Sequence, residues 1–325
     1  MSNDPRPTPW AVGWEERPQE DRIMKNITQY FGITRAVPFV DVAVARDNLL
    51  FIDPHAIRLS RTPGPFAGEA IDCIDSYFDT IARCVMSPSV SDRMRGRALL
   101  NHFPEPKETR FGMSVNGFHG HGGAADVGRW IWNGLSTDLH ALLRVGVLKR
   151  LEELPLYIDG VGDDITSDIT TRIIYGPLAR YTAEMVRRYP EFSSHGHKLV
   201  TIRSQAWDPS TREWVVAAFT LPVAHGEPLL LVPTSWARSG MLMSARRFYE
   251  TSVLTYVQDE QAVLNSRGKL LKSPKYRLRT LPGLEPGRRT NLKVTLRALE
   301  SSDDVLDLFR KFVAMRAALQ ERDAG

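Results

Sequence analysis

The 325-residue sequence has only two cysteines, Cys73 and Cys84. On the helix expected there, the eleven positions between them correspond to about 16 Å of helical rise, which is too far for a disulfide. So few cysteines are typical of a protein from a reducing compartment. A chain of this length is expected to bury a sufficient hydrophobic core without disulfides.

Long hydrophobic runs are also missing. The longest apolar stretches, such as 229–233, have the length of a strand, whereas about 20 apolar residues are needed to cross a bilayer. The polar, proline-rich residues 1–20 lack the apolar segment of a signal peptide, and they predict a flexible arm. The sequence therefore predicts a cytoplasmic protein with no membrane partner.

Several catalytic motifs are absent as well. The sequence contains no Gly-x-Ser-x-Gly elbow of the kind found in α/β-hydrolases. The glycine-rich residues 117–128 are not followed by the Lys-Ser/Thr pair that the phosphate loop of a nucleotide hydrolase requires. We therefore expect neither a serine hydrolase nor a nucleotide hydrolase.

Hydrophobic periodicity predicts a mixture of helices and strands. Apolar residues at spacings of three and four predict helices at 67–85 and 303–320, each with one buried stripe. A turn at Asp208 and Pro209 predicts a hairpin of strands 198–206 and 214–221. Further helices are expected at 21–31, 91–100, 124–133, 137–151, 168–175, 177–189 and 245–265, and further strands at 37–44, 49–52, 229–233 and 291–298.

The order of these elements predicts an α+β fold in which helices pack against a modest mixed sheet. The sequence has no internal repeat. We expect a single domain at 21–325, and a sub-boundary near residue 195 is left open.

Positive charge is concentrated near the C-terminal end of the sequence. Residues 267–297 contain ten Lys and Arg against one acid, Glu285, although the net charge of the whole chain is only +4. Such a local field suits the phosphates of a nucleic acid, and a solvated loop or a partner-binding surface is the alternative. The expected phosphate contacts are Lys275, Arg277, Arg279, Arg288 and Arg289.

Negative charge gathers at 160–168, where three aspartates and two hydroxyl residues lie within nine positions. On a helix, Asp164 and Asp168 share one face. Carboxylates this close repel each other unless a cation or a helix N-terminus compensates them. One interpretation is therefore a Mg²⁺ site, with Mn²⁺ as an alternative, in which Glu108 supplies a third carboxylate.

Two other interpretations stay open. The acidic segment also fits a helix start, with Thr166 or Ser167 as the cap and Asp168 in the first turn. Separately, the motifs His119-Gly120-His121 and His195-Gly196-His197 together offer four imidazoles, which is the ligand number of a zinc site.

Several short stretches, at 50–54, 104–112, 160–170 and 228–233, resemble a family of bacterial proteins of uncharacterised function associated with antiviral defence or restriction loci. The element Asp164-x-x-Ser167-Asp168 also resembles the acidic motif of restriction-endonuclease-like (PD-D/E-x-K) nucleases. This resemblance implies an αβββα core that cleaves DNA with Mg²⁺, held by Asp164, Asp168 and Glu108. No acid-x-Lys tripeptide follows Asp168, so either Lys198 or Gln205 would take the place of the catalytic lysine.

These patterns predict a Mg²⁺-dependent nuclease of a bacterial antiviral or restriction system, with a nucleic acid, expected to be DNA, as its partner. Its catalytic residues would be Glu108, Asp164, Asp168 and Lys198. Two alternatives stay open. One is a non-catalytic subunit that binds nucleic acid or a partner protein in a defence complex, and the other is a zinc-dependent hydrolase.

Overall fold

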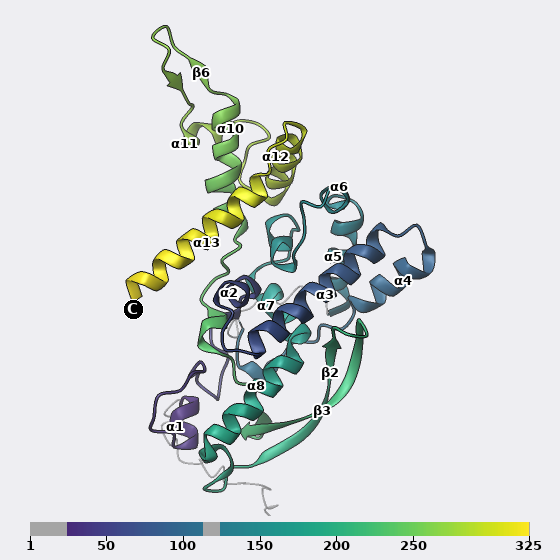
Figure 1. Ribbon diagram of the computed structural model, residues 1–325, viewed down its shortest axis with the longest axis vertical. Helices are drawn as coiled ribbons and strands as arrows, with labels where there is room; N and C mark the ends of the chain where they lie inside the picture. The colour runs from purple at the N-terminus through teal and green to yellow at the C-terminus, as the bar shows by residue number, and fades with distance from the viewer. Residues whose placement is uncertain (1–24, 113–123, 325) are drawn as a thin grey trace, which may run out of the picture.

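The computed structural model describes residues 25–112 and 124–324, and its fold is α+β (Figure 1). Helices dominate, and the strands of the described residues form three small antiparallel sheets. The arm expected at 1–20 lies outside these residues. Among the described helices, none is long and apolar enough to pass through a membrane.

The long helix α3 (Phe66–Met86) lies at the centre of the fold. Its predicted apolar stripe is confirmed, since Ile74, Phe78 and Ile81 are buried. Cys73 and Cys84 are buried on the same helix as free thiols. The helices that contact α3 are α2 (Pro54–Ser60), α4 (Val90–Leu99), α5 (Ala124–Ser136), α6 (His140–Arg144), α7 (Asp163–Ile173) and α8 (Tyr175–Arg188).

The largest sheet is the predicted hairpin of β2 (Leu199–Asp208) and β3 (Glu213–Ala224), in which Trp207 lies opposite Trp214. The carboxylate of Asp208 closes the turn, because it accepts hydrogen bonds from the backbone N–H and the hydroxyl of Ser210. The short β4 (Glu227–Pro228) adds a third strand, and α7 and α8 pack against the sheet. A second sheet pairs β1 (Phe51–Ile52) with β5 (Ala237–Arg238).

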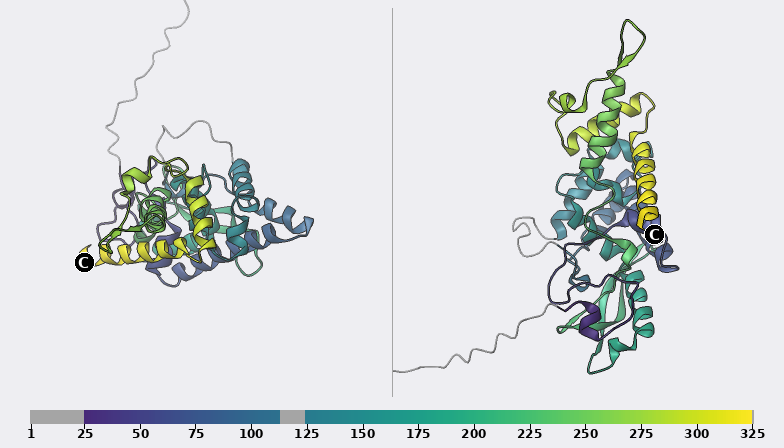
Figure 2. Two further views of the ribbon diagram at one scale, coloured as in Figure 1. Left: turned by 90° about the horizontal axis from the view of Figure 1, so that it is seen from above. Right: turned by 90° about the vertical axis from the view of Figure 1, so that its left-hand side faces the viewer.

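The C-terminal helices gather at one end of the molecule, and the β2–β3 hairpin lies at the other end (Figure 1, Figure 2). Here α9 (Ala245–Phe248), a π-helical turn (Tyr249–Val253) and α10 (Leu254–Glu260) follow one another without a break. A short hairpin of β6 (Val263–Leu264) and β7 (Leu270–Leu271) projects beyond α10. The chain returns through α11 (Lys275–Leu278), α12 (Arg288–Glu300) and α13 (Val305–Ala324).

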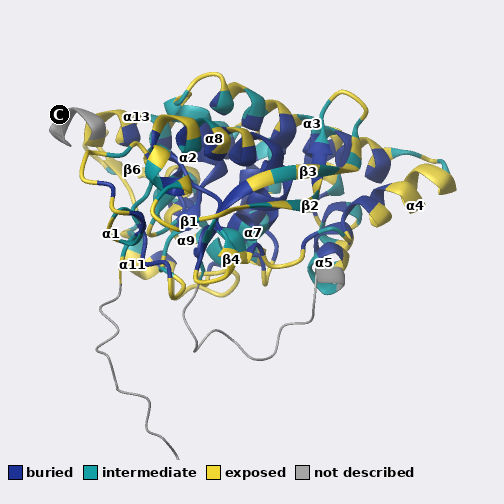
Figure 3. Ribbon diagram, turned by 90° about the horizontal axis from the view of Figure 1, so that it is seen from below, coloured by how far each residue is buried: buried dark blue, intermediate teal, exposed yellow. Residues whose placement is uncertain are grey.

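One hydrophobic core runs beneath the helices, and its buried residues colour the inner faces of α3, α7 and α8 dark blue in Figure 3. Helix α1 (Ile27–Phe31) contributes two buried side chains, Ile27 and Phe31, to this core. In the described part of the chain, four 3-10 turns connect the elements, at Lys107–Thr109, Leu151–Leu156, Pro190–Ser193 and Thr234–Trp236.

The strand predicted at 291–298 is wrong, because these residues lie inside α12. Their buried side chains, among them Asn291, Val294 and Ala298, recur at helical spacings of three and four. Other helices differ from the prediction in their bounds. The expected helix at 137–151 is reduced to α6, and the one expected at 168–175 is part of α7, which begins five residues earlier.

The strands predicted at 37–44 and 229–233 are also wrong. Neither segment belongs to a described sheet, and their residues form only isolated β-bridges. The two segments pair with each other at one bridge, between Phe39 and Pro233, and other backbone groups of these segments bond elsewhere in the chain. For example, Leu230 N donates to the carbonyl of Glu108, and Leu231 N donates to Thr182 Oγ1.

Candidate functional site

The aspartate-rich segment forms the first turns of α7, whose N-cap is Gly162. The predicted cap is therefore wrong. The Thr166 hydroxyl donates to the carbonyl of Gly162 from within the helix, and Ser167 Oγ accepts a hydrogen bond from Ile52 N at 2.9 Å. The helix starts before these residues because Asp163 occupies its first turn, where a carboxylate faces the positive end of the helix dipole.

Asp164 and Asp168 lie four residues apart on α7, as the helical interpretation predicted. Burial first, and then the nearby charges of Asp164 and Glu105, raise the pKa of Asp168 to about 8. The guanidinium of Arg172 offsets only part of this effect. Asp168 therefore keeps its proton to a higher pH than an ordinary aspartate does.

Glu108 lies on the Lys107–Thr109 turn, and its negative charge is compensated by residues other than the aspartate pair. Its Oε1 accepts a hydrogen bond from the hydroxyl of Tyr175 at 3.1 Å, and its Oε2 lies 3.6 Å from Arg172 Nη2. Arg172 itself is buried, and it donates to the carbonyls of Pro104 and Glu105. Glu108 and Arg172 thus hold the 104–109 loop against α7 and α8.

The structure does not bring the three predicted magnesium ligands together. Within residues 25–112 and 124–324, no group of three or more His, Cys, Asp or Glu side chains is arranged to hold a metal ion. Glu108 is neutralised by Arg172, so only Asp164 and Asp168 remain as a candidate pair. Mg²⁺ often takes one or two protein carboxylates and completes its shell with water, so a two-ligand site stays a prediction.

The residues predicted to replace the catalytic lysine have other surroundings. Lys198 is exposed directly before β2, and within the described part of the chain it makes no ion pair with Asp168. Gln205 Oε1 lies 2.9 Å from Nδ1 of His102. Neither side chain is therefore positioned beside the aspartate pair by any contact of its own.

The histidine motifs do not form a described zinc site. His119 and His121 lie outside the described residues. Nδ1 of His195 lies 2.9 Å from Ser194 Oγ, and the ring of His197 packs against Phe31 with 4.7 Å between ring centroids. The second histidine pair thus serves local packing and hydrogen bonding.

The predicted basic residues fall into three groups. Lys275 is partly buried, and its Nζ donates to the carbonyl of Glu250 and to Thr255 Oγ1, so it fastens α11 to α10 instead of facing a phosphate. Burial lowers the pKa of Lys275. Arg277 and Arg289 are exposed, and neither side chain makes an ion pair within the described residues.

The remaining two, Arg279 and Arg288, line one cavity of about 580 Å³ together with Arg246. The three arginines come from separate segments, at α9, at the end of α11 and at the start of α12. The N-cap of α12, Gly287, also lines the cavity. We call this cavity, with its three arginines and the first turn of α12, the arginine cleft.

The first turn of α12 is open to an anion. Gly287 supplies no side chain to cap the helix, and its first turn carries no acidic residue. The first backbone N–H groups of a helix have no partner within the helix, and the helix dipole makes this end positive. A phosphate or carboxylate at this position therefore gains both hydrogen bonds and a favourable field.

The arginines are held in place by hydrogen bonds. Arg288 Nε donates to the carbonyl of Pro155 at 2.7 Å, and its Nη2 donates to the carbonyl of Val161 at 3.0 Å. Arg246 and Arg279 share Glu250 Oε1, each at 3.2 Å. An anion that enters the cleft would share these two guanidinium groups with Glu250 or displace its carboxylate.

Asn291 adds a buried acceptor to the wall of the cleft. Its side chain is 1% exposed, and its Nδ2 donates to the carbonyls of Leu156 and Ala245. Its Oδ1 is buried and has no hydrogen-bond partner in the described part of the chain. A ligand that offers a donor beside its anionic group would satisfy this oxygen.

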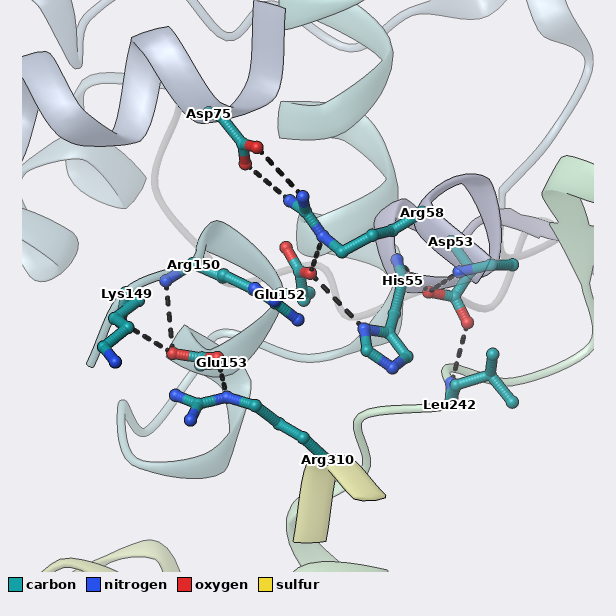
Figure 4. Close-up of polar contacts among 11 residues, drawn as sticks. Asp53, His55, Arg58, Asp75, Lys149, Arg150, Glu152, Glu153, Leu242 and Arg310 are labelled. Atoms are coloured by element: carbon teal, nitrogen blue, oxygen red, sulfur yellow. Dashed lines mark hydrogen bonds and ion pairs between the residues drawn. The ribbon is translucent and has the colours of Figure 1, made fainter. Parts of the chain in front are cut away.

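A network of buried charges fixes the Leu151–Leu156 turn that holds this wall (Figure 4). Glu152 Oε1 accepts from Arg58 Nε at 2.8 Å and lies 3.3 Å from His55 Nδ1, and Arg58 makes two hydrogen bonds to Asp75. Burial opposes the ionisation of Glu152, but His55 and Arg58 outweigh it and hold its pKa at about 2. Glu153 is also fully buried and pairs with an arginine of α13.

A family model described as a domain of unknown function, DUF8370, matches residues 32–244, which is more than half of the chain. The chain belongs to the DUF8370 family. The comparisons with curated proteins and with solved structures gave no match.

The DUF8370 region and the C-terminal segment both contribute to the arginine cleft. Pro155, Val161 and the 3-10 turn lie inside the matched residues, whereas Arg246, Arg279 and Arg288 follow them. The acidic pair on α7 and the buried network around Glu152 also lie within the DUF8370 region.

Sequence reasoning missed Arg246, Asn291 and the buried network. Arg246 lies before the basic segment, so charge clustering does not detect it. Glu152 and Glu153 are buried, and in the sequence they lie between two apolar residues, Leu151 and Leu154. These apolar neighbours were the one feature of the sequence from which their burial could have been predicted.

Proposed function

We propose that this protein binds the phosphate backbone of a nucleic acid at the arginine cleft. The observation that carries the proposal is the convergence of Arg246, Arg279 and Arg288 on the uncapped first turn of α12, in a cavity of about 580 Å³. Guanidinium groups bind phosphate through paired hydrogen bonds, and an open helix start adds backbone donors.

The surroundings of the cleft support a chain of phosphates better than a single small anion. Arg277 and Arg289 are exposed near Arg279 and Arg288 in the sequence, and both belong to the basic segment 267–297. Successive phosphates of one strand would contact the cleft and then these outer arginines. Phosphate contacts position a nucleic acid without reading its sequence, so we expect binding with little sequence preference.

The test is a titration of fluorescent single-stranded and double-stranded DNA, and of RNA, against wild type and the double variant Arg246→Ala/Arg279→Ala. Both side chains are at least 43% exposed, so their removal is expected to leave the fold intact. Each lost phosphate contact should weaken binding several-fold. The matched control is Arg93→Ala, an exposed arginine of α4. Equal affinity of the double variant and the control would contradict the proposal.

A second candidate is Mg²⁺-dependent cleavage of the bound strand by the Asp164–Asp168 pair. The observation that favours it is the raised pKa of Asp168, about 8, which comes from burial and the nearby charge of Asp164, since a divalent cation at this position would favour the ionised carboxylate. The pair lies on α7, whose first residue, Asp163, lines the arginine cleft. Such an ion would activate a water for attack on phosphorus.

For this candidate, the test compares wild type with Asp168→Asn in Mg²⁺ and in EDTA. Cleavage that needs Mg²⁺ and disappears in the variant is the expected result, with nucleic-acid affinity unchanged. Cleavage that survives in the variant would exclude this pair as the metal site. A role in bacterial antiviral defence or restriction, in the cytoplasm and with a partner protein of such a system, stays a prediction from the sequence resemblance.

A further inference from the structure

The wall of the arginine cleft holds a buried acceptor that has no donor in the described part of the chain. Asn291 of α12 lines the cleft and is 1% exposed. Its Oδ1 makes no hydrogen bond within the described residues. Buried polar atoms of native proteins nearly always have a partner. An orphaned acceptor beside an anion site therefore indicates a ligand that brings a donor.

The orientation of the Asn291 amide is fixed by its two donor hydrogens. Nδ2 donates to the carbonyl of Leu156 at 2.9 Å and to the carbonyl of Ala245 at 3.2 Å. A flipped amide would place Oδ1 against these two carbonyls, and all three oxygens are acceptors. Oδ1 is therefore the atom of this side chain that is left for a ligand, and it can only accept a hydrogen bond.

The acidic side chains of the cleft already have partners. Glu250 Oε1 accepts hydrogen bonds from two arginines of the cleft, and Asp163 Oδ2 accepts one from Met241 N at 3.2 Å. Asp159 is 85% exposed to water, and its Oδ1 lies 3.8 Å from the third arginine. A donor on the ligand is therefore best matched by Oδ1 of Asn291.

This acceptor lies one helical turn from the open start of α12. Asn291 N donates to the carbonyl of the N-cap, Gly287, so the two residues enclose the first turn, which is about 6 Å of helical rise. In the proposed function, the first backbone N–H groups of α12 and Arg288 bind a phosphate. A ligand that uses the helix start and Asn291 together therefore carries a donor next to a phosphate.

The ribose of an RNA strand supplies such a donor. Its 2′-hydroxyl stands on the carbon next to the one that carries the 3′-phosphate, and it repeats at every nucleotide whatever the base. The sugar of DNA has no hydroxyl at this position, so the donors within a DNA strand are on its bases. Phosphate contacts do not read the bases. A donor that accompanies every phosphate must therefore belong to the sugar.

We propose that the arginine cleft is a site for RNA, in which Oδ1 of Asn291 accepts a hydrogen bond from the 2′-hydroxyl beside the bound phosphate. This inference rests on the proposed function, because it needs a phosphate backbone in the cleft, and it adds the identity of the sugar. The arginines and the helix start bind the phosphates of RNA and DNA equally, whereas Asn291 distinguishes the two sugars. DNA, which the sequence resemblance implied, then binds as the weaker ligand.

The first test compares three single-stranded oligonucleotides on wild type, namely RNA, DNA and 2′-fluoro RNA, with the same base sequence and uracil in each. Fluorine keeps the sugar pucker of RNA but cannot donate a hydrogen bond. RNA should bind about 3- to 10-fold more tightly than either of the other strands, which is the effect of one hydrogen bond. Equal affinity for RNA and DNA would overturn the inference. So would a 2′-fluoro strand that binds like RNA, because the shape of the sugar would then be recognised instead of its donor.

The second test asks whether Asn291 carries the preference, and its readout is the ratio of RNA affinity to DNA affinity. Asn291→Ala should reduce this ratio to about 1, whereas a purely structural effect lowers both affinities together and leaves the ratio unchanged. The matched control is Thr295→Val, which removes another buried polar group of α12 outside the lining of the cleft and should keep the ratio of wild type. An unchanged ratio in folded Asn291→Ala would contradict the inference. The first test needs no variant, so it applies even if Asn291→Ala does not fold.

The inference and the proposed function fail in different ways. Arg246→Ala/Arg279→Ala should weaken the binding of RNA and DNA by the same factor, because it removes phosphate contacts and leaves Asn291 in place. If this double variant binds both strands like wild type, the proposed function is wrong and the inference falls with it. If it weakens both strands but wild type does not prefer RNA, phosphate binding at the cleft stands and the assignment of RNA is wrong.

Discussion

Arg310 Nε lies 2.7 Å from Glu153 Oε1, and this pair joins the C-terminal helix α13 to the 3-10 turn at Leu151–Leu156. Glu153 is fully buried, and the side chain of Arg310 is only 11% exposed. The same turn offers the carbonyl of Pro155 to Arg288. The geometry of the arginine cleft thus depends on a buried ion pair.

Replacing Arg310 by methionine should destabilise the protein strongly. The change leaves the carboxylate of Glu153 buried without its partner, and breaking such a pair typically costs about 3–5 kcal/mol. Chemical denaturation measures the effect. The control is Lys311→Met, because Lys311 is 74% exposed and its ion pair with Asp307 is screened by solvent, so its loss should change stability little. Equal stabilities of the two variants would show that the pair does not hold the turn.

Stability should depend on the ionisation of Glu152 at acid pH. The pKa of Glu152 is about 2 in the folded state against an ordinary value of 4.5, so its contribution is present above pH 4.5 and is lost as the pH falls towards 2. This contribution is roughly 3 kcal/mol. Glu152→Gln should therefore be less stable than wild type at neutral pH, and the difference should shrink in acid. Urea unfolding at several pH values measures it. A difference that does not change with pH would contradict this account.

The ionisation of Asp168 should change the stability of the protein with pH in the opposite direction. Its folded-state pKa, about 8, lies above the unfolded value of 3.8, so the folded state holds a proton that the unfolded state loses between these values. Wild type should therefore lose stability as the pH rises from about 4 to about 8, whereas Asp168→Asn should lose less. Melting temperatures across this range measure the effect. If the pair binds Mg²⁺, the ion should restore stability at about pH 9 in wild type only.

Changing Gly287 to aspartate should separate stability from binding. The backbone there is extended with φ 167°, and a Cβ would meet no atom within 4 Å, so the residue fits. Aspartate would cap α12 and stabilise the protein by about 0.5 kcal/mol. It would also occupy the anion site and weaken nucleic-acid binding several-fold. Gly287→Asn is the matched control, since it caps without charge. A loss of affinity that is equal in both variants would show that charge at this helix start is unimportant.

The α+β class and most long helices follow from the sequence because their apolar stripes are clear, as on α3. The same rule failed for α12, which resembles a strand in its β-branched Val294 and Thr295. Its buried face is formed partly by Asn291 and Thr295, and the Nδ2 of Asn291 and the hydroxyl of Thr295 donate to backbone carbonyls. A hydrophobic pattern does not register buried polar residues, so the helix could not be predicted from it.

The candidate site was predictable only in part. Charge clustering identified Arg279 and Arg288, and helical spacing identified the Asp164–Asp168 pair. The sequence did not indicate that Glu108 pairs with Arg172, since that contact brings together residues 64 positions apart. Nor did it indicate that Arg246 joins the other two arginines, because that depends on how α9, α11 and α12 are placed in the fold.

The dependence of DNA affinity on salt tests the central claim most directly, because it counts phosphate contacts. For duplex DNA, the slope of log affinity against log salt changes by about 0.9 for each phosphate neutralised. We expect Arg246→Ala/Arg279→Ala to reduce the slope by about 1 to 2 relative to wild type, and Arg93→Ala to leave it unchanged. A double variant whose slope equals that of wild type would contradict phosphate binding at the arginine cleft.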